Sequence, residues 1–513
     1  MRHHGPTLHH QVTVRTVLAR GLELFPDAPA LVTQDGEWSW RELDRLSSNY
    51  AKNLLGAGLK PGDRIASFLP NCGDLFIHYL GVFKAGLVAV PLNYRYTHYE
   101  IDHALEVSDA RAIVFDGERS DDVAGSSRAA SLDLRFVFGE VGALGGTPIT
   151  ALMAESGDQD PPAPGRESPA VIFFTSGSTG PAKGVTHTHN TLGWVLSSTA
   201  VSYQLSPDDR TLAGSSCSHI GSFMAVLASW SQGAMAIAPR VGQLEPTLAL
   251  MRRWQPTVAI LLPAALFKLE RDAHTAPEDF ASLRVVISGG DKVPEQLETE
   301  FVEKTGLPID EVYGMTEIGI SHLNPSSGLV KFGSVGRTMP GYMAELRDET
   351  GRVVPIGEEG RLYVKFLGTM AYYWGRPEAT TEVYGEDGWF DTGDMMRADE
   401  QGYYYFCGRK KQIIVHDGSN IFPQEVEEAL LQHDAVENAG VIGIADLVHG
   451  ENVRAFVEVR EGASPISEVD LIAFAAERVG YKAPETIVFL DQMPINPTGK
   501  VDRVTLKRLA GGE

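Results

Sequence analysis

Residues 170–189 read AVIFFTSGSTGPAKGVTHTH, and this stretch decides how the rest of the chain is interpreted. Its first part is an apolar run typical of a buried strand, and it passes directly into a turn of Gly, Ser, Thr and Lys. Glycines let a backbone approach an anion closely, hydroxyl and N–H groups donate hydrogen bonds, and Lys183 adds a mobile positive charge. The sequence therefore predicts that the loop from Thr175 to Gly184 holds an oligophosphate.

The loop differs from the Walker A motif of P-loop NTPases. That motif, GxxxxGK[ST], requires Gly at position 182 and Ser or Thr at position 184, where this chain has Ala182 and Gly184. The P-loop NTPase class is therefore excluded. A Ser- and Gly-rich surface loop without a ligand is the alternative that the loop alone leaves open.

The flanking sequence predicts the fold class. The first 120 residues alternate strand and helix patterns, which favours parallel βαβ units, and a second block of this kind begins near Pro169. Between Asp116 and Pro169 the pattern weakens, so we expect a solvent-facing connection with one isolated strand. Short strands and Gly-rich turns at 333–408 predict a β-rich subdomain, and residues 412–513 carry enough elements for a separate small domain.

Composition excludes several function classes. The 513 residues hold 44 Lys and Arg against 67 Asp and Glu, a net charge of −23, which disfavours nucleic acid and anionic membranes as partners. Cys72, Cys217 and Cys407 lie far apart and form no disulfide or metal-binding pattern. No signal peptide and no run of about 18 apolar residues is present, so we expect a cytoplasmic protein without a membrane span. The acidic surface allows a homodimer.

The chain carries five notable segments in order: FTSGSTGPAKGVTHTH at 174–189, SGGDKVP at 288–294, VYGMTEIG at 312–319, WFDTGD at 389–394 with GRKKQIIVHDGSNIFPQEVE at 408–427, and NPTGKVDR at 496–503. Together they resemble the adenylate-forming superfamily, the acyl-CoA synthetases and their relatives. The resemblance implies an α/β fold with a large N-terminal domain, residues 1–409, that combines mixed and parallel α/β subdomains with the β-rich subdomain. It also implies a small, mobile α+β C-terminal domain, residues 410–513.

The resemblance implies an enzyme that uses ATP, Mg²⁺ and coenzyme A. In this chemistry a carboxylate attacks the α-phosphorus of ATP and expels pyrophosphate, so cations and N–H donors must surround the developing charge. Thr316 would reach the α-phosphate, Tyr313 would stack on adenine, and Glu317 would help to hold Mg²⁺ as the one expected metal ligand. The remaining implied contacts are Thr175, Ser176, Gly177, Ser178, Thr179, Gly180 and Lys183 for the β- and γ-phosphates, Gly289, Gly290 and Asp291 for the wall opposite Tyr313, and Asp394 and Arg409 for ribose.

Three further residues follow from the resemblance in the C-terminal part. Lys500 would enter the active site and bridge the carboxylate and the α-phosphate, which supplies proximity as well as charge. Lys411 matches the hinge about which the small domain rotates after pyrophosphate leaves. Gly418 matches a glycine that borders the pantetheine tunnel, and Asp417 departs from the small residue often found before it.

The segment Cys217–Phe223 indicates which class of carboxylic acid is the expected substrate. It holds no acidic residue that could bind the ammonium group of an amino acid, and His219 resembles the histidine that lines the acyl pocket of acyl-CoA synthetases. Apolar lining favours an aliphatic or aromatic carboxylic acid without a charged head group. The residues expected to provide it are Phe223, Met224, Val312, Gly314, Ile318 and Met339.

The acyl acceptor is expected to be coenzyme A, because the chain ends without a carrier domain of its own. A free acyl carrier protein presents the same thiol and is the alternative. An adenylate-binding protein without turnover and a luciferase-like oxygenase are alternatives of another class. The combined presence of Lys500, Glu317 and Lys411 argues against a protein without turnover.

Overall fold

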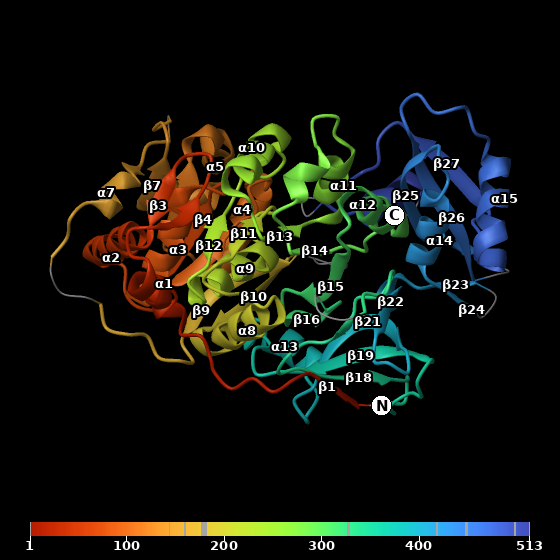
Figure 1. Cartoon of the computed structure of the whole chain (residues 1–513), viewed down its shortest axis with the longest axis horizontal. Coiled ribbons are helices and arrows are strands. Elements are labelled where there is room, and N and C mark those ends of the chain that lie inside the picture. Colours follow the sequence, from red (N-terminus) through yellow and green to blue (C-terminus); the bar gives the residue numbers. More distant parts are fainter. Residues whose placement is uncertain are drawn as a thin grey trace. The chain divides into compact units, whose positions relative to one another are not determined.

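The computed structural model describes residues 2–142, 144–157, 161–175, 182–325, 329–416, 419–446, 450–496 and 499–511. The chain divides into two compact units (Figure 1). The larger unit comprises His4–Met343 and Val364–Phe390, and the smaller one comprises Met1–His3, Ala344–Tyr363 and Asp391–Glu513.

An eight-stranded sheet of the larger unit carries the strands on either side of the predicted phosphate loop. Its order is β20-β10-β9-β5-β4-β6-β7-β8, and β9, β5, β4, β6, β7 and β8 run parallel. The parallel βαβ units predicted for the first 120 residues are therefore confirmed. The strands are β4 (Arg64–Phe68), β5 (Val88–Pro91), β6 (Ala112–Asp116), β7 (Leu134–Phe138), β8 (Thr147–Pro148), β9 (Pro169–Thr175), β10 (Lys183–Thr188) and β20 (Tyr372–Tyr373).

The second sheet of this unit has nine strands, in the order β17-β16-β15-β14-β13-β11-β12-β2-β3. The six central strands, β15, β14, β13, β11, β12 and β2, are parallel. The outer strands β3, β16 and β17 are antiparallel to their neighbours. The strands are β2 (Pro29–Val32), β3 (Glu37–Ser39), β11 (Arg210–Ala213), β12 (Met235–Ile237), β13 (Val258–Leu261), β14 (Val285–Gly289), β15 (Ile309–Met315), β16 (Gly319–Leu323) and β17 (Arg337–Thr338).

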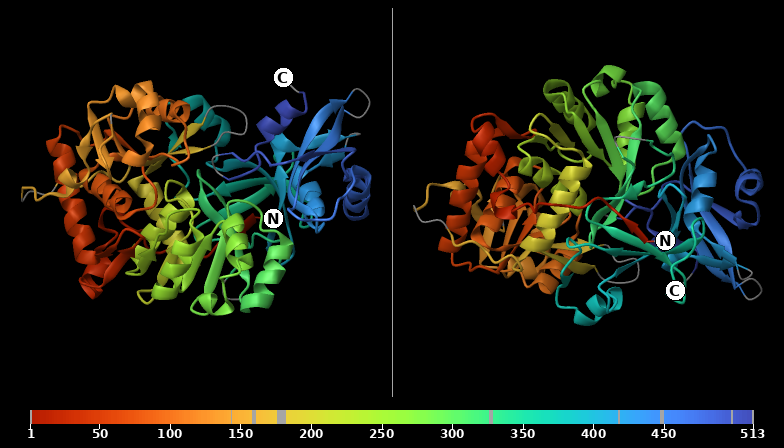
Figure 2. Two further views of the ribbon diagram at one scale, coloured as in Figure 1. Left: turned by 90° about the horizontal axis from the view of Figure 1, so that it is seen from above. Right: turned by 60° about the horizontal axis from the view of Figure 1, so that its bottom comes forward.

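Helices connect and cover these sheets, which can be followed in Figure 2. Helix α2 begins where Ser39 and Glu42 cap each other, the hydroxyl of Ser39 accepting from the Glu42 N–H and the Glu42 carboxylate accepting from the Ser39 N–H. The helices are α1 (Ala19–Leu24), α2 (Trp40–Gly56), α3 (Gly73–Ala85), α4 (His98–Ser108), α5 (Ser120–Gly125), α6 (Ser127–Ala130), α7 (Thr150–Met153), α8 (His189–Ser202), α9 (Ile220–Ser231), α10 (Leu244–Trp254), α11 (Pro263–Arg271), α12 (Glu295–Thr305) and α13 (Pro377–Val383).

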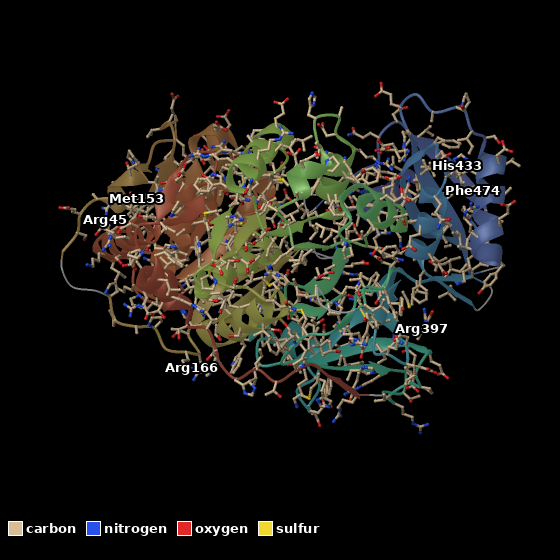
Figure 3. All side chains as sticks on the ribbon, in the orientation of Figure 1. Arg45, Met153, Arg166, Arg397, His433 and Phe474 are labelled. Atoms are coloured by element: carbon tan, nitrogen blue, oxygen red, sulfur yellow. The ribbon has the colours of Figure 1, made fainter. Side chains whose placement is uncertain are left out.

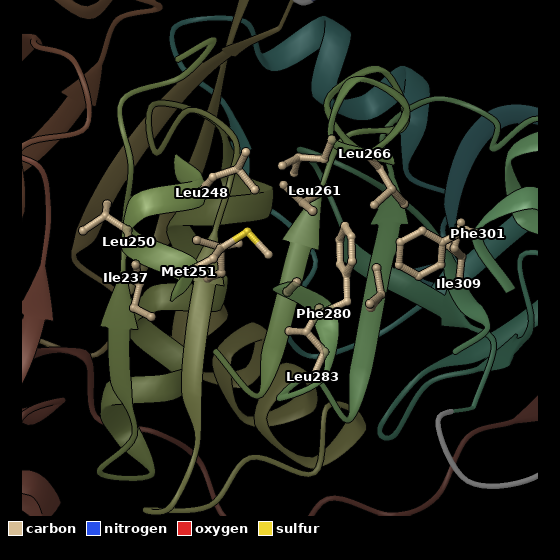
Figure 4. Close-up of a cluster of buried hydrophobic side chains, with 14 of the residues drawn as sticks. Ile237, Leu248, Leu250, Met251, Leu261, Leu266, Phe280, Leu283, Phe301 and Ile309 are labelled. Atoms are coloured by element: carbon tan, nitrogen blue, oxygen red, sulfur yellow. The ribbon is translucent and has the colours of Figure 1, made fainter. Parts of the chain in front are cut away.

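A buried apolar cluster joins the nine-stranded sheet to α10, α11 and α12. Ile237 and Leu261 come from the strands, Met251 and Leu266 from the helices, and Phe280 packs against Phe301 with ring centroids 5.3 Å apart (Figure 4). Burial of such side chains is the main favourable contribution to folding. The cluster therefore fixes the strands whose carboxyl ends carry Gly289 and Tyr313.

The strand predicted between Asp116 and Pro169 is present as β7, but the prediction of a solvent-facing connection is wrong. The segment contains α5, α6, α7, β7 and β8, and β7 is an interior strand of its sheet with Phe136 and Val137 buried. Helices of four to six residues hold too few apolar positions to produce a periodic signal. Their polar composition therefore resembles that of a loop.

The smaller unit contains two five-stranded sheets. One has the order β1-β18-β19-β21-β22, and the other has the order β24-β23-β26-β25 with β27 paired to β26. The strands are β1 (Arg2–His4), β18 (Met343–Arg347), β19 (Glu359–Lys365), β21 (Phe390–Ala398), β22 (Tyr404–Arg409), β23 (Ile414–His416), β24 (Ser419–Ile421), β25 (Val436–Asp446), β26 (Gly450–Val459) and β27 (Thr486–Leu490).

Three helices complete this unit, α14 (Pro423–Leu431), α15 (Glu468–Val479) and α16 (Arg503–Leu509). Phe474 on α15 contacts the ring of His433 just after α14, with centroids 4.7 Å apart (Figure 3). The mixed α/β architecture with a small β-containing C-terminal part confirms the expected fold class. A domain boundary between residues 409 and 410 stays a prediction.

Within the described ranges, no helix combines the length and the apolar character that crossing a membrane requires.

Candidate active site

The two ends of the predicted phosphate loop are neighbours in the larger unit. Thr175 ends β9, Lys183 begins β10, and these residues are antiparallel partners. His103 on α4 secures the second end, because its Nε2 donates to the carbonyl oxygen of Ala182 over 2.8 Å. The other predicted phosphate contacts, Ser176, Gly177, Ser178, Thr179 and Gly180, lie outside the described residues.

The turn between β15 and β16 carries Thr316 and Glu317, and three hydrogen bonds hold its backbone. The carbonyl oxygens of residues 316, 317 and 318 accept hydrogen bonds from His187 Nε2 at 2.8 Å, from the Met370 N–H at 2.6 Å and from Tyr342 Oη at 2.6 Å. The hydroxyl of Thr316 makes no hydrogen bond with any residue that the structure describes, and the side chain is half-buried. The turn therefore presents this hydroxyl on a fixed backbone.

Glu317 is a buried carboxylate with a tyrosine partner. Only 5% of the residue is exposed, and its Oε1 accepts a hydrogen bond from Tyr373 Oη over 2.8 Å. Burial, and then the charge of Glu317, raise the pKa of Tyr373 well above its ordinary value, because both disfavour the phenolate. Tyr373 is therefore the donor and Glu317 the acceptor at neutral pH.

Lys183 contacts the same tyrosine. Its Nζ lies 4.7 Å from the centroid of the Tyr373 ring, within the range of a cation–π interaction. The cation at the end of the predicted phosphate loop, Lys183, and the carboxylate of Glu317 thus both contact the side chain of Tyr373. The structure brings these two predicted site residues together.

The donor set fits Mg²⁺ better than a transition metal. Among the described residues, no group of three or more His, Cys, Asp or Glu side chains could hold a metal ion. Mg²⁺ usually keeps several waters and binds through one or two carboxylates together with substrate phosphates. Glu317, a buried carboxylate that shares the contact residue Tyr373 with Lys183, matches that pattern.

The residues predicted to hold adenine lie at the carboxyl ends of two neighbouring parallel strands. Gly289 ends β14 and pairs with Val312 of β15, one residue before Tyr313, and Gly290 follows with a φ of +87°. A Cβ on Gly289 would lie 2.6 Å from the carbonyl oxygen of Val312, so only glycine permits this approach. Ligands of open α/β sheets bind at such strand ends. Asp291 is exposed beside them.

His219 occupies the residue before α9, and its Nε2 lies 3.2 Å from the amide nitrogen of Asn93. The preceding loop is anchored by Asn71, whose amide donates to the Ser215 carbonyl and accepts from the Cys217 N–H, each over 2.9 Å. His219 therefore sits on a supported loop. Its role toward an acid stays a prediction.

The expected apolar lining is placed on several elements. Phe223 and Met224 lie on α9, Val312 and Gly314 on β15, Ile318 in the turn and Met339 after β17. The Phe223 ring lies edge-on to those of Tyr79, Phe83 and Phe173, with centroids 5.1, 6.2 and 5.2 Å away. These contacts show how Phe223 packs and leave its role as acyl-pocket lining a prediction.

The predicted ribose pair lies in the smaller unit. Asp394 on β21 and Arg409 on β22 are antiparallel partners, and Arg409 Nε lies 3.2 Å from Asp394 Oδ1. Asp394 is buried and Arg409 is half-buried. The structure thus joins two residues that lie 15 positions apart in the sequence.

The predicted lysines also lie in this unit. Lys411 is exposed in a short 3₁₀ helix, Lys410–Gln412. Lys500 is half-buried in a turn in which its N–H donates to Asn496 Oδ1 over 3.1 Å and its carbonyl accepts from the Asn496 N–H over 2.8 Å. Gly418 lies outside the described residues.

Sequence reasoning missed the residues that support the turn. His187 belongs to the quoted stretch, and a histidine alternating with apolar residues of a strand could have suggested a buried polar contact. Tyr373 lies in a two-residue strand without a periodic signal. Its contacts with Glu317 and Lys183 appear only in three dimensions.

Comparison with known proteins agrees with this geometry. A family model described as AMP-binding enzyme matches residues 18–374, and one described as AMP-binding enzyme C-terminal domain matches residues 425–500. A feruloyl-CoA synthase from an Amycolatopsis species is 32% identical over 499 residues, covering 96% of this chain and 98% of that protein. The fatty acid–[acyl-carrier-protein] ligase ScoC of Streptomyces coeruleorubidus is 30% identical, with coverages of 98% and 97%.

Among solved structures, ATP-bound MatB from Rhodopseudomonas palustris superimposes with a TM-score of 0.88 at 28% identity, covering 96% of this chain and 98% of that one. Fold and site together define an adenylate-forming enzyme. The chain belongs to the AMP-binding enzyme family, and it is an AMP-forming acid–thiol ligase of the acyl-CoA synthetase kind.

Proposed function

We propose that this enzyme activates an aliphatic or aromatic carboxylic acid as an acyl-adenylate and transfers the acyl group to coenzyme A. The observation that carries the proposal is that Lys183 and Glu317 both contact Tyr373, Lys183 at the ring and Glu317 at the hydroxyl. A cation for the polyphosphate and a carboxylate for a metal ion are the two charges that this chemistry needs in fixed positions.

In the first half-reaction the carboxylate of the acid attacks the α-phosphorus, an acyl–phosphate bond forms, and pyrophosphate leaves. Lys183 and the loop 175–180 hold the β- and γ-phosphates, and Thr316 donates its hydroxyl to the α-phosphate. Mg²⁺, held by Glu317, neutralises phosphate charge when bound. The adenosine contacts that we propose are Tyr313, Gly289, Gly290 and Asp291 for adenine, and Asp394 and Arg409 for ribose.

Lys500 acts in this half-reaction alone. Its ammonium contacts the carboxylate and the α-phosphate together, which brings two anions into reacting distance at a reduced electrostatic cost. Rotation of the C-terminal domain, residues 410–513, about Lys411 then replaces Lys500 by a passage for the thiol, with Gly418 at its border. The thiol attacks the acyl carbon, a thioester forms, and AMP leaves.

The substrate class rests on the segment Cys217–Phe223 and on the relatives. The segment offers His219 and apolar residues and no carboxylate for an ammonium group. The relatives are named for feruloyl and fatty acyl groups, so both aromatic and aliphatic acids are supported. An aliphatic acid would place the enzyme in fatty acid metabolism.

A free acyl carrier protein is the second candidate acceptor, because the fatty acid ligase of Streptomyces coeruleorubidus is named for that partner. Its prosthetic arm ends in the same thiol as coenzyme A, so the site residues serve either acceptor.

The test is a panel of fatty, branched and aromatic acids with ATP and Mg²⁺, each supplied with coenzyme A, with a phosphopantetheinylated carrier protein, or with neither. Pyrophosphate is measured by a coupled assay and the thioester by mass spectrometry. We expect a thioester of coenzyme A with at least one acid. If a thioester forms with the carrier protein alone, the acyl acceptor is the carrier protein and not coenzyme A. Absence of pyrophosphate with every acid would contradict the proposal.

A further inference from the structure

Tyr373 is fixed by the strand that carries Lys183. Strand β20 pairs with β10 so that Val185 lies opposite Tyr373, and the N–H groups of Ala371 and Trp374 donate to the carbonyls of Thr186 and Gly184 over 2.9 and 2.7 Å. The N–H of Tyr373 itself donates to Thr380 Oγ1 over 3.0 Å. The tyrosine backbone is therefore held on both sides.

The side chain is fixed as well. Only 5% of Tyr373 is exposed, its hydroxyl donates to Glu317 and its ring lies beside the Lys183 ammonium. The backbone of Glu317 is held independently, because its carbonyl accepts from the Met370 N–H and the hydroxyl of Tyr384 donates to the Met370 carbonyl. The freedom that remains to Glu317 is that of its side chain, and the Tyr373 hydroxyl restrains it.

We propose that Tyr373 is a positioning residue that acts on two charges at once: its hydroxyl orients the Glu317 carboxylate toward the metal ion, and its ring holds the Lys183 ammonium at the phosphates. The inference rests on the proposed function of Glu317 and Lys183. Long charged side chains lose rotamer freedom when they bind a ligand, and an ordered partner reduces that loss in advance.

Two substitutions separate the two contacts. Tyr373→Phe removes the hydroxyl and keeps the ring beside Lys183, whereas Tyr373→Leu removes both. Tyr372→Phe is the matched control, because this neighbour on β20 is half-buried and its hydroxyl makes no hydrogen bond with a residue that the structure describes. Thermal unfolding of each variant verifies that it is folded.

Equilibrium binding by calorimetry uses three probes, ATP with Mg²⁺, ATP in EDTA, and AMP. A hydrogen bond to a charged group contributes about tenfold in affinity, so Tyr373→Phe should weaken binding of ATP with Mg²⁺ by about tenfold. Binding of ATP in EDTA and of AMP should stay within about twofold of wild type, because neither probe brings a metal ion to Glu317. Tyr373→Leu should also weaken ATP in EDTA, and Tyr372→Phe should bind all three probes as wild type does.

A double-substitution cycle tests the route of action. If Tyr373 acts through Glu317, then Tyr373→Phe weakens binding of ATP with Mg²⁺ in wild type and adds little in the Glu317→Gln background. Additive losses would overturn the inference. So would equal losses for all three probes, which a merely structural role produces, and so would wild-type binding by Tyr373→Phe.

The binding results can be interpreted even if the proposed ligase reaction fails. If wild type binds ATP with Mg²⁺ and no acid yields pyrophosphate, the ligase reaction fails as a proposal and the binding cycle still decides the role of Tyr373.

Discussion

His187 shows how one buried residue supports a turn that is distant in sequence. Its Nε2 donates to the carbonyl of Thr316 over 2.8 Å, and its Nδ1 lies 3.3 Å from the Thr191 hydroxyl. Burial lowers the pKa of His187 to about 4, so the ring is neutral at physiological pH. A neutral ring protonated on Nε2 can serve both contacts. A buried histidine on β10 therefore supports the turn that carries Thr316 and Glu317.

Asp310 on β15 provides a test of burial at the residue scale. The residue is 1% exposed, and burial raises the pKa of its carboxyl to about 7 from an ordinary 3.8. The folded state then binds a proton that the unfolded state has released, so this group makes the protein less stable as pH rises toward 7. Asp310→Asn removes the titration. The difference in the free energy of unfolding, variant minus wild type, should therefore increase with pH. We expect it to be about 2 kcal/mol larger at pH 8 than at pH 5.

Urea unfolding at four pH values between 5 and 8 measures this difference. Stability curves of variant and wild type that run parallel across the range would contradict the assignment of a raised pKa to Asp310.

At the scale of elements, the hairpin of β15 and β16 determines where Tyr313 and Thr316 lie. A Cβ on Gly314 would lie 2.2 Å from the Gly319 carbonyl oxygen and 2.8 Å from the Ile320 Cα, both in the backbone of β16. The register shifts between Tyr313 and Gly314, so the strands approach closely at this irregularity. The hairpin therefore requires a glycine between two residues with predicted nucleotide contacts.

Gly314→Ala should push β16 away from β15. We expect a loss of about 2 kcal/mol in the free energy of unfolding and a loss of at least about tenfold in ATP affinity, because the clash is with backbone that cannot rotate away. Gly56→Ala on α2 is the control, since a Cβ there meets nothing within 4 Å. Wild-type ATP affinity in Gly314→Ala would show that the hairpin does not position the nucleotide.

The elements also show what could be predicted from the sequence. The strands β9, β13 and β14 were predictable because each is an apolar run that ends in a turn. The Asp394–Arg409 pair was predicted from the family resemblance. In the structure the two residues lie opposite each other on the antiparallel strands β21 and β22. The short helices α5 to α7 and the two-residue strand β20 carry no period, and so Tyr373 could not be predicted. Contacts such as His187 with Thr316 join residues 129 positions apart.

At the scale of the whole molecule, the predicted site residues divide between the two units. The larger unit holds Lys183, Tyr313, Thr316 and Glu317, and the smaller unit holds Asp394, Arg409, Lys411 and Lys500. In the reaction that we propose, only residues 410–513, which carry Lys411 and Lys500, change place between the two steps, and Asp394 and Arg409 keep their contacts with ribose. Two substitutions in the smaller unit test this division.

Lys500→Ala should remove the first step and spare the second. We expect acyl-adenylate formation to fall by at least about 100-fold, because the cation that neutralises both reactants is lost. Conversion of a chemically prepared acyl-adenylate to the thioester should stay within about threefold of wild type. Loss of both half-reactions would contradict a role confined to adenylation.

Lys411→Pro should have the reverse effect. Proline fixes φ, and at this exposed position in the 3₁₀ helix it removes no backbone hydrogen bond donated to a described residue. We expect acyl-adenylate to form at a rate within about threefold of wild type and thioester formation to slow by at least about tenfold. Single-turnover measurements of the two steps provide the comparison, and equal slowing of both would refute the hinge.

The most direct measurement for the central claim follows oxygen from the acid. A carboxylic acid labelled with ¹⁸O in its carboxyl group is converted with ATP, Mg²⁺ and coenzyme A, and the nucleotide product is analysed by mass spectrometry. Attack of the carboxylate on the α-phosphorus predicts AMP that carries one ¹⁸O and pyrophosphate that carries none. Unlabelled AMP, or ADP with labelled phosphate, would contradict adenylate formation by this enzyme.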